Sequence, residues 1–253
     1  MDLQYRQAPR VKISDVTLGY DGHPAVHHLG GEIASGSMTA VVGPNGSGKS
    51  TLLKGIVGLL RPMDGHIDIE GMDRARIGYL PQQANIDRSF PISVYEMVCL
   101  GLWNRTGMFG GISRDDQERV AGAIATVGLE GFEKRTLDTL SGGQLQRVLF
   151  ARVLVQDSPL ILLDEPFTAI DTSTTNHLMD LLTRWHSENR TIVAVVHDLD
   201  QAREQFPDAL LIARELIAWG SSREVLTPAN LLRARAMSER WDDDAPWCER
   251  AVG

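Results

Sequence analysis

The stretch GPNGSGKS, Gly43–Ser50, decides the fold of this chain. It has the spacing G-x-x-x-x-G-K-[ST], and it lies between the apolar run MTAVV and the helical stretch STLLKGIVGLL. Glycines let the main chain curl around phosphate oxygens, and the N-terminus of the following helix adds N–H groups and a partial positive charge. The sequence therefore predicts a phosphate-binding loop between a buried strand and a helix.

Each side chain of this loop has an expected role. Lys49 is expected to reach the β- and γ-phosphates of a nucleotide, Ser50 to offer its hydroxyl to Mg²⁺, and Thr51 to hydrogen-bond a phosphate from the first helical turn. The residues expected to cradle the phosphates are Gly43, Pro44, Asn45, Gly46, Ser47, Gly48, Lys49, Ser50 and Thr51.

A second motif, LILLDEP, ends an apolar strand with the carboxylates of Asp164 and Glu165. Carboxylates at the end of a buried parallel strand face the same edge of the sheet as a phosphate loop. Asp164 is expected to hold Mg²⁺ in its second shell, and Glu165 to accept a proton from the attacking water or to polarise it.

A third motif, LSGGQLQRV, begins at Leu140 and precedes an apolar helical run. Ser141 stands at a helix N-cap position, and two glycines expose N–H groups behind it, which predicts another phosphate receptor. One nucleotide cannot easily occupy two such helix N-termini within one small domain. The second receptor is therefore expected to serve a nucleotide held by another copy of the chain.

The whole chain reads as a folded α/β protein. It has 253 residues, of which 43% are hydrophobic and 23% charged, and a net charge of −8 without a Lys/Arg block, which argues against nucleic acid as the main partner. Short apolar runs alternate with helical patterns, the clearest after Asp171, which indicates a parallel sheet. Other helical patterns cover Val94–Trp103 and Arg114–Val127. No stretch is long enough to cross a bilayer, and no secretory signal is evident.

The three motifs together resemble the ATP-binding subunits of ABC transporters, over about Val11–Arg235. GPNGSGKS is similar to the Walker A motif of that family, LILLDEP to Walker B and LSGGQ to the signature motif, in the family's order. The resemblance implies a P-loop ABC ATPase with a RecA-like core, an antiparallel β subdomain and a helical insertion at about 84–155. Residues 236–253 are expected to form an acidic C-terminal tail.

The resemblance implies further site residues. Tyr20 would be the aromatic residue that stacks on adenine, and His197 the switch histidine that hydrogen-bonds the γ-phosphate. Gln82 would reach the metal and the attacking water when the insertion rotates, although Gln83 beside it makes that assignment ambiguous. Asp171 would shape the dimer contact near the nucleotide. The signature residues that would bind the partner's nucleotide are Ser141, Gly142, Gly143 and Gln144.

The resemblance also implies partners and a location. The chain would hydrolyse ATP with Mg²⁺ as a head-to-tail dimer on the cytoplasmic face of the inner membrane, bound to a separate permease. The segment after Gly78 is similar to ATPases of zinc and manganese uptake systems, which would add an extracytoplasmic metal-binding protein. The alternatives are a siderophore or iron-complex importer, a soluble ABC ATPase outside transport, and a nucleotide-binding module without turnover.

Apolar residues of the insertion leave two possibilities open. They could form the groove that the family presents to its permease, or they could form the insertion's own small core. The residues concerned are Met97, Trp103, Met108 and Phe109.

Overall fold

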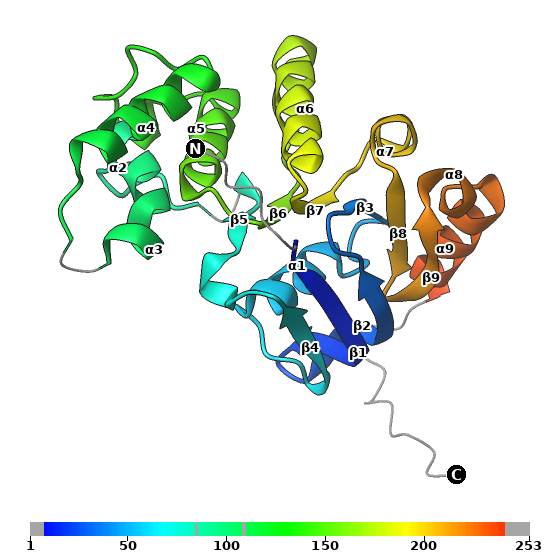
Figure 1. Cartoon of the computed structure of the whole chain (residues 1–253). Coiled ribbons are helices and arrows are strands. Elements are labelled where there is room, and N and C mark those ends of the chain that lie inside the picture. Colours follow the sequence, from blue (N-terminus) through cyan, green and yellow to red (C-terminus); the bar gives the residue numbers. More distant parts are fainter. Residues whose placement is uncertain (1–7, 84–85, 108–109, 241–253) are drawn as a thin grey trace.

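The computed structural model describes residues 8–83, 86–107 and 110–240 of the chain. Its strands are β1 (Arg10–Tyr20), β2 (His23–Ile33), β3 (Met38–Val42), β4 (Asp64–Glu70), β5 (Gly78–Leu80), β6 (Leu160–Asp164), β7 (Thr191–Val195), β8 (Asp208–Ala213) and β9 (Glu215–Ser221). Its α-helices are α1 (Lys49–Val57), α2 (Val94–Cys99), α3 (Trp103–Thr106), α4 (Arg114–Thr126), α5 (Gly142–Gln156), α6 (Thr172–Ser187), α7 (Leu199–Gln205), α8 (Ser222–Val225) and α9 (Pro228–Arg240). Figure 1 shows their arrangement.

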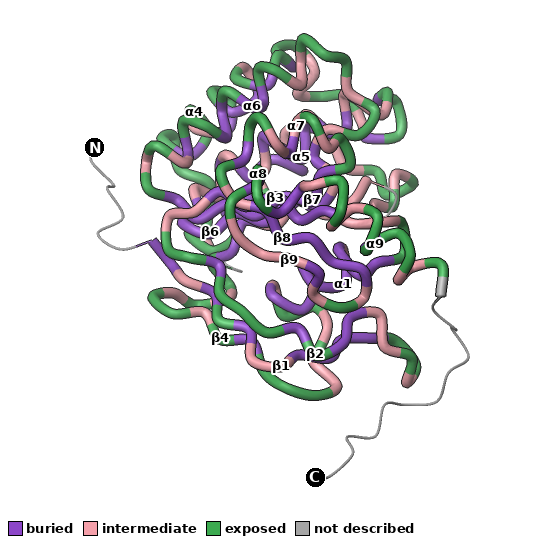
Figure 2. Tube along the Cα trace, turned by 90° about the vertical axis from the view of Figure 1, so that its right-hand side faces the viewer, coloured by how far each residue is buried: buried purple, intermediate pink, exposed green. Residues whose placement is uncertain are grey.

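The larger sheet has the strand order β5-β6-β7-β3-β8-β9. All neighbours pair in parallel except β8 and β9, which are antiparallel. The three strands β3, β6 and β7 are buried along their whole length, as Figure 2 shows for the centre of the molecule. Short apolar runs form such strands because both faces of a parallel sheet are covered. The predicted α/β core with a parallel sheet is confirmed.

A smaller antiparallel sheet, in the order β2-β1-β4, lies across one face of the larger sheet. Helix α1 packs between the two sheets through Leu52, Leu53 and Ile56, which belong to one apolar core with residues of β1, β2, β6, β7 and β8. In β3 the side chains alternate, so that Val41 enters this core while Ala40 and Val42 enter the core on the opposite face. Both layers therefore fix the start of α1, where the phosphate loop ends.

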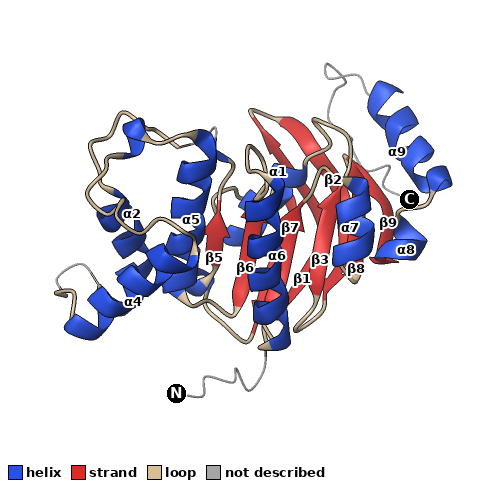
Figure 3. Cartoon of the chain, turned by 90° about the horizontal axis from the view of Figure 1, so that it is seen from above, coloured by secondary structure: helices blue, strands red, loops and turns tan. Residues whose placement is uncertain are grey.

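Helices α2 to α5 form a separate layer beyond the β5 edge, as the view from above shows (Figure 3). The single helix expected at Val94–Trp103 is instead divided into α2, a 3₁₀ turn at Leu100–Leu102, and α3. The division occurs at Gly101, which brings the 3₁₀ turn against the backbone of α5 at Arg152. Helix α4 follows the expected Arg114–Val127 closely, and a capping box at Ser113 begins it.

The C-terminal helix extends further than the sequence analysis expected. The acidic tail was expected from residue 236, but α9 continues to Arg240. Ala234 is buried in the main core, and Arg235 pairs with Glu239 one turn later, 2.9 Å apart, so the helical pattern does not end at Arg235. The remaining tail, with Trp241, Trp247 and Cys248, lies outside the described residues.

Two glycines of the helical layer give opposite stability predictions. A Cβ added at Gly101 would lie 2.3 Å from the carbonyl oxygen of Arg152, whereas one at Gly122 in α4 would meet nothing within 4 Å. Gly101→Ala should therefore cost about 1–3 kcal/mol through forced shifts in packing. Gly122→Ala should gain about 0.5–1 kcal/mol of helix stability.

Thermal melting of the two variants beside the parent checks this pair. Gly101→Ala should melt below the parent and Gly122→Ala at or above it. The opposite order would mean that the 3₁₀ turn at Leu100–Leu102 does not pack against α5 as described.

Candidate functional site

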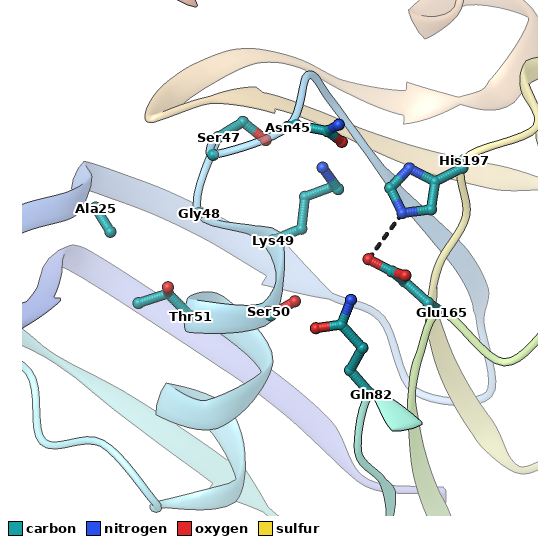
Figure 4. Close-up of a pocket in the computed structure, with 11 residues that line it drawn as sticks. Ala25, Asn45, Ser47, Gly48, Lys49, Ser50, Thr51, Gln82, Glu165 and His197 are labelled. Carbon is teal, nitrogen blue, oxygen red and sulfur yellow. Dashed lines mark ion pairs between the residues drawn. The ribbon is translucent and has the colours of Figure 1, made fainter. Parts of the chain in front are cut away.

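The carboxyl ends of four parallel strands meet at one edge of the larger sheet. The phosphate loop follows β3, Glu165 follows β6, His197 follows β7 and Gln82 follows β5. A cavity of about 600 Å³ opens there (Figure 4). Its lining residues are Ala25, Asn45, Gly46, Ser47, Gly48, Lys49, Ser50, Thr51, Gln82, Glu165 and His197.

The loop leads directly into the start of α1 and lines the cavity. Gly46 and Gly48 have φ values of +75° and +91°, a left-handed conformation that disfavours side chains. At Gly46 an added Cβ would find open space, whereas at Gly48 it would collide with Val26 of β2. Gly48 therefore holds the helix start against the small sheet, and Gly46 leaves the curve of the loop open to a ligand.

Lys49 is held inside this curve. Its ammonium donates to the carbonyl oxygens of Gly43 and Pro44, at 2.9 and 2.7 Å, and the residue is buried. Burial lowers the pKa of Lys49, although the nearby carboxylates of Glu165 and Asp164 oppose that shift. A buried cation facing a phosphate-sized cavity is suited to bind a polyphosphate.

Ser50 lines the cavity, and Asp164, which is not among the lining residues, lies behind Ser50. The Ser50 hydroxyl donates to Oδ1 of Asp164 at 2.8 Å. Asp164 is fully buried, and its Oδ2 has no hydrogen-bond partner among the described residues. Burial raises the pKa of Asp164, so its ionised form needs a positive partner. These donors fit Mg²⁺, which prefers oxygen ligands and keeps several of its waters.

Glu165 points into the cavity toward His197. Its carboxylate lies 2.8 Å from Nε2 of His197, and its backbone is left-handed, with φ of +53°. Burial alone would raise the pKa of Glu165, but the hydrogen bond and charge interaction with His197, together with a hydrogen bond from Gln82, lower it. Glu165 is therefore held as a carboxylate.

The two adjacent glutamines face different ways. Gln82 lines the cavity, whereas the amide of Gln83 donates to the carbonyl oxygen of Gly142 in the signature loop. Of the two, Gln82 is the one among the lining residues of the cavity.

The signature residues lie apart from this cavity. Ser141 caps α5 in a capping box with Gln144: the Ser141 amide donates to Oε1 of Gln144 at 3.0 Å, and the Gln144 amide donates to the Ser141 hydroxyl at 3.3 Å. Ser141 is exposed, and residues 141–144 are absent from the cavity lining among the described residues. The structure therefore does not bring this helix N-terminus to the phosphate loop of its own chain.

Two other predicted residues lie at the margins. Asp171 caps α6 by accepting from the amide and hydroxyl of Thr174, at 2.9 and 2.8 Å. Tyr20, at the end of β1, is 46% exposed and has the ammonium of Lys54 5.6 Å from its ring centre. Neither lines the cavity, although the exposed ring of Tyr20 remains open to a planar ligand.

Sequence reasoning missed two residues near this site. Ala25 of β2 lines the cavity because the small sheet packs against Gly48. Gln146 of α5 is buried and donates to the carbonyl oxygen of Pro166, which follows Glu165. Neither contact has a local motif; both come from the packing of separate layers.

Comparison with known proteins places this geometry in a family. Residues 26–168 match the family described as ABC transporter. The chain is 38% identical over 226 residues to a probable metal transport system ATP-binding protein of Chlamydia trachomatis, which covers 88% of this chain and 87% of the relative. It is 37% identical over 225 residues to the manganese transport system ATP-binding protein MntB of Bacillus subtilis, which covers 87% and 90%.

Solved structures agree with the fold. A metal-chelate type ABC transporter in an inward-facing conformation matches with a TM-score of 0.78 and 29% identity, over 91% of this chain and 90% of that one. The dimeric structure of the bacterial cassette MJ0796 matches with a TM-score of 0.75 and 29% identity, over 84% and 99%. The predicted family and fold are thus confirmed, and the chain belongs to the ABC transporter family as one of its ATP-hydrolysing cassettes.

Proposed function

We propose that this cassette powers the import of a divalent transition metal, manganese or zinc, through a separate permease. The observation that carries the proposal is the convergence of Lys49, Gln82, Glu165 and His197 on one cavity, in a chain more than a third identical to metal transport ATPases. The cavity residues support ATP hydrolysis, and the similarity to metal transport proteins supports the class of cargo.

Each side chain of the cavity has a role in the proposed reaction. Lys49 binds the β- and γ-phosphates, and the loop N–H groups hold the remaining oxygens. Glu165 accepts the proton of the attacking water, and His197, 2.8 Å away, hydrogen-bonds the γ-phosphate and orients that carboxylate. Tyr20 stacks on adenine.

Mg²⁺ belongs at the corner formed by Ser50 and Asp164, with Gln82 beside it. When bound there, the ion supplies charge that stabilises the β- and γ-phosphates as they separate. The Ser50 hydroxyl acts as its ligand, and Asp164 holds the ion's water shell through the oxygen that has no partner within the described chain.

Two copies of the chain complete each site. The N-terminus of α5, formed by Ser141, Gly142, Gly143 and Gln144, is absent from the lining of the cavity among the described residues, and Ser141 is exposed. This supports a head-to-tail dimer in which these residues bind the partner's nucleotide. Asp171, at the start of α6, lies at the edge of that contact. The dimeric form of the similar cassette MJ0796 supports the same arrangement.

The helical layer offers a surface for the permease. Phe90, Leu100 and Trp103 are 64%, 46% and 54% exposed, whereas Met97 belongs to the core. The exposure of Trp103 supports the permease surface, the burial of Met97 supports a role in the insertion's own core, and Met108 and Phe109 lie outside the described residues. Within the described residues no helix is long and apolar enough to cross a membrane. We place the protein at the cytoplasmic face of the inner membrane, bound to its permease through this layer.

The proposed cassette spans residues 11–235, with the helical insertion at about 84–155. Helix α9 continues past residue 235 to Arg240, before the acidic tail. A second cargo remains open because the similar inward-facing structure is of the metal-chelate type. A siderophore or other iron complex is therefore the alternative, and a metal-binding extracytoplasmic protein would deliver the cargo in either case.

Glu165→Gln should keep ATP binding and lose most turnover, because it removes the base and leaves the phosphate loop intact; the loss should be about 100-fold or more. Lys49→Ala should instead weaken binding itself. Nucleotide affinity and phosphate release, measured side by side with the exposed Glu118→Gln as a control, check this. Parental turnover in Glu165→Gln would exclude Glu165 as the base.

Glu165→Gln with saturating ATP should also form a stable dimer, since ATP that is bound and not hydrolysed holds the two copies together. Light scattering of this variant, with and without ATP, measures the mass. A protein that stays monomeric both alone and assembled with its permease would contradict the shared site.

Deletion of the gene should lower cellular manganese or zinc under chelation, and added metal should restore growth. A plasmid copy of the parent should complement, whereas a Lys49→Ala copy should not. Normal levels of both metals together with lost siderophore uptake would move the assignment to the iron alternative and leave the ATPase predictions untouched.

A further inference from the structure

The segment that follows β6 rests on the first turns of α5. We call this segment, residues 165–170, the catalytic turn. It has two left-handed residues, Glu165 at φ +53° and Ala169 at φ +62°. Non-glycine residues adopt this conformation only when their surroundings hold them in it. The turn makes its own hydrogen bond, from the Thr168 amide to the Glu165 carbonyl oxygen at 3.3 Å, and further contacts come from α5 of the same chain.

Gln146 makes the central contact. Its side chain is 1% exposed, and its amide nitrogen lies 3.0 Å from the carbonyl oxygen of Pro166 and 3.4 Å from that of Glu165. Its own Oε1 has no hydrogen-bond partner among the described residues. Burial of a side-chain amide whose oxygen accepts no hydrogen bond costs free energy. We therefore expect a specific role for the hydrogen bonds that the amide nitrogen of Gln146 donates.

Two neighbouring contacts also join α5 to the catalytic turn and to the segment after β5. A Cβ at Gly143 would lie 3.0 Å from the carbonyl oxygen of Ala169, so the first turn of α5 touches the far end of the catalytic turn. The amide of Gln83, beside Gln82, donates to the carbonyl oxygen of Gly142. The signature loop is therefore joined in its own chain both to the catalytic turn and to the segment that carries Gln82.

We propose that Gln146 is a positioning residue for hydrolysis: by donating to the carbonyl oxygens of Pro166 and Glu165, it holds the left-handed turn that aims the Glu165 carboxylate at His197 and into the cavity. The inference rests on the proposed role of Glu165 as the base. It adds that the orientation of this base depends on the helix that begins at Ser141. In the proposed dimer, α5 thereby links the nucleotide that the partner holds to the base that acts on the chain's own nucleotide.

Two variants of Gln146 separate the effect of its hydrogen-bond donor from the effect of its side-chain size. Gln146→Met keeps the length and removes the donor, and Gln146→Asn keeps the donor but shortens its reach. In the purified full-length chain both should lower kcat at least about tenfold, as loss of a well-placed base does. ATP affinity, measured by displacement of a fluorescent ATP analogue, should stay within about twofold because neither variant alters the phosphate loop.

Gln156→Met is the matched control. Gln156 stands at the far end of the same helix and donates to the carbonyl oxygen of Ile77 at 2.7 Å, away from the cavity. It should lose stability as the Gln146 variants do and keep the parental kcat. Parental kcat in the folded Gln146 variants, or parallel losses of kcat and ATP affinity, would overturn the inference. If instead Glu165→Gln itself turned over normally, the proposed role of Glu165 as the base would fail first.

Discussion

The parallel pairing of β5, β6, β7 and β3 is the constraint on which the rest of the site depends. Leu80 pairs with Leu163, Asp164 with Val195, and Val41 with Val195, so the four strands end at the same edge of the sheet. Residues that are far apart in sequence, Gln82, Glu165 and His197, then meet the phosphate loop with no further device. A slip of one residue in any of these strands would turn its apolar side chains to the wrong face and move its catalytic residue away.

Burial at this edge of the sheet also shifts the pKa values of the charged residues in and beside the cavity. Burial lowers the pKa of Lys49 and raises that of Asp164, and the charges of neighbouring side chains oppose both shifts. Phosphate and Mg²⁺ supply the opposite charges that both groups need. The cavity therefore combines a buried cation with a buried carboxylate, and its ligands would add to the charge balance that the side chains provide.

In the proposed dimer, the helical layer carries the second phosphate receptor, at the N-terminus of α5. Its signature helix begins at an exposed cap, and the phosphate loop of the same chain lies elsewhere, across the β5 edge. In the proposed dimer, such a chain holds one phosphate cradle for its own nucleotide and one receptor for the nucleotide of its partner. Pairing of two copies is the arrangement that uses both, and the contacts of α5 with the catalytic turn connect them.

The sequence was most informative where chemistry is local. The phosphate loop, the LILLDEP strand and the signature cap each depend on neighbouring residues, so pattern and spacing predicted the elements that carry them. The direction of Gln82 against Gln83, the contact of Gln146 with Pro166 and the division of the helix at Gly101 depend on the packing of separate layers. The extension of α9 to Arg240 was missed because weak periodicity in ARAMSER hides a helix that is held by the burial of Ala234.

Phosphate release from covalently linked dimers tests the shared site most directly. In one linked pair, a single copy carries both Lys49→Ala and Ser141→Arg; in the other, each copy carries one of the two changes. If every site combines the phosphate loop of one copy with the signature loop of the other, the divided pair keeps one intact site and the first pair keeps none, so the divided pair should release phosphate faster. Faster release from the pair with both changes in one copy would show that each chain works alone and would contradict the account.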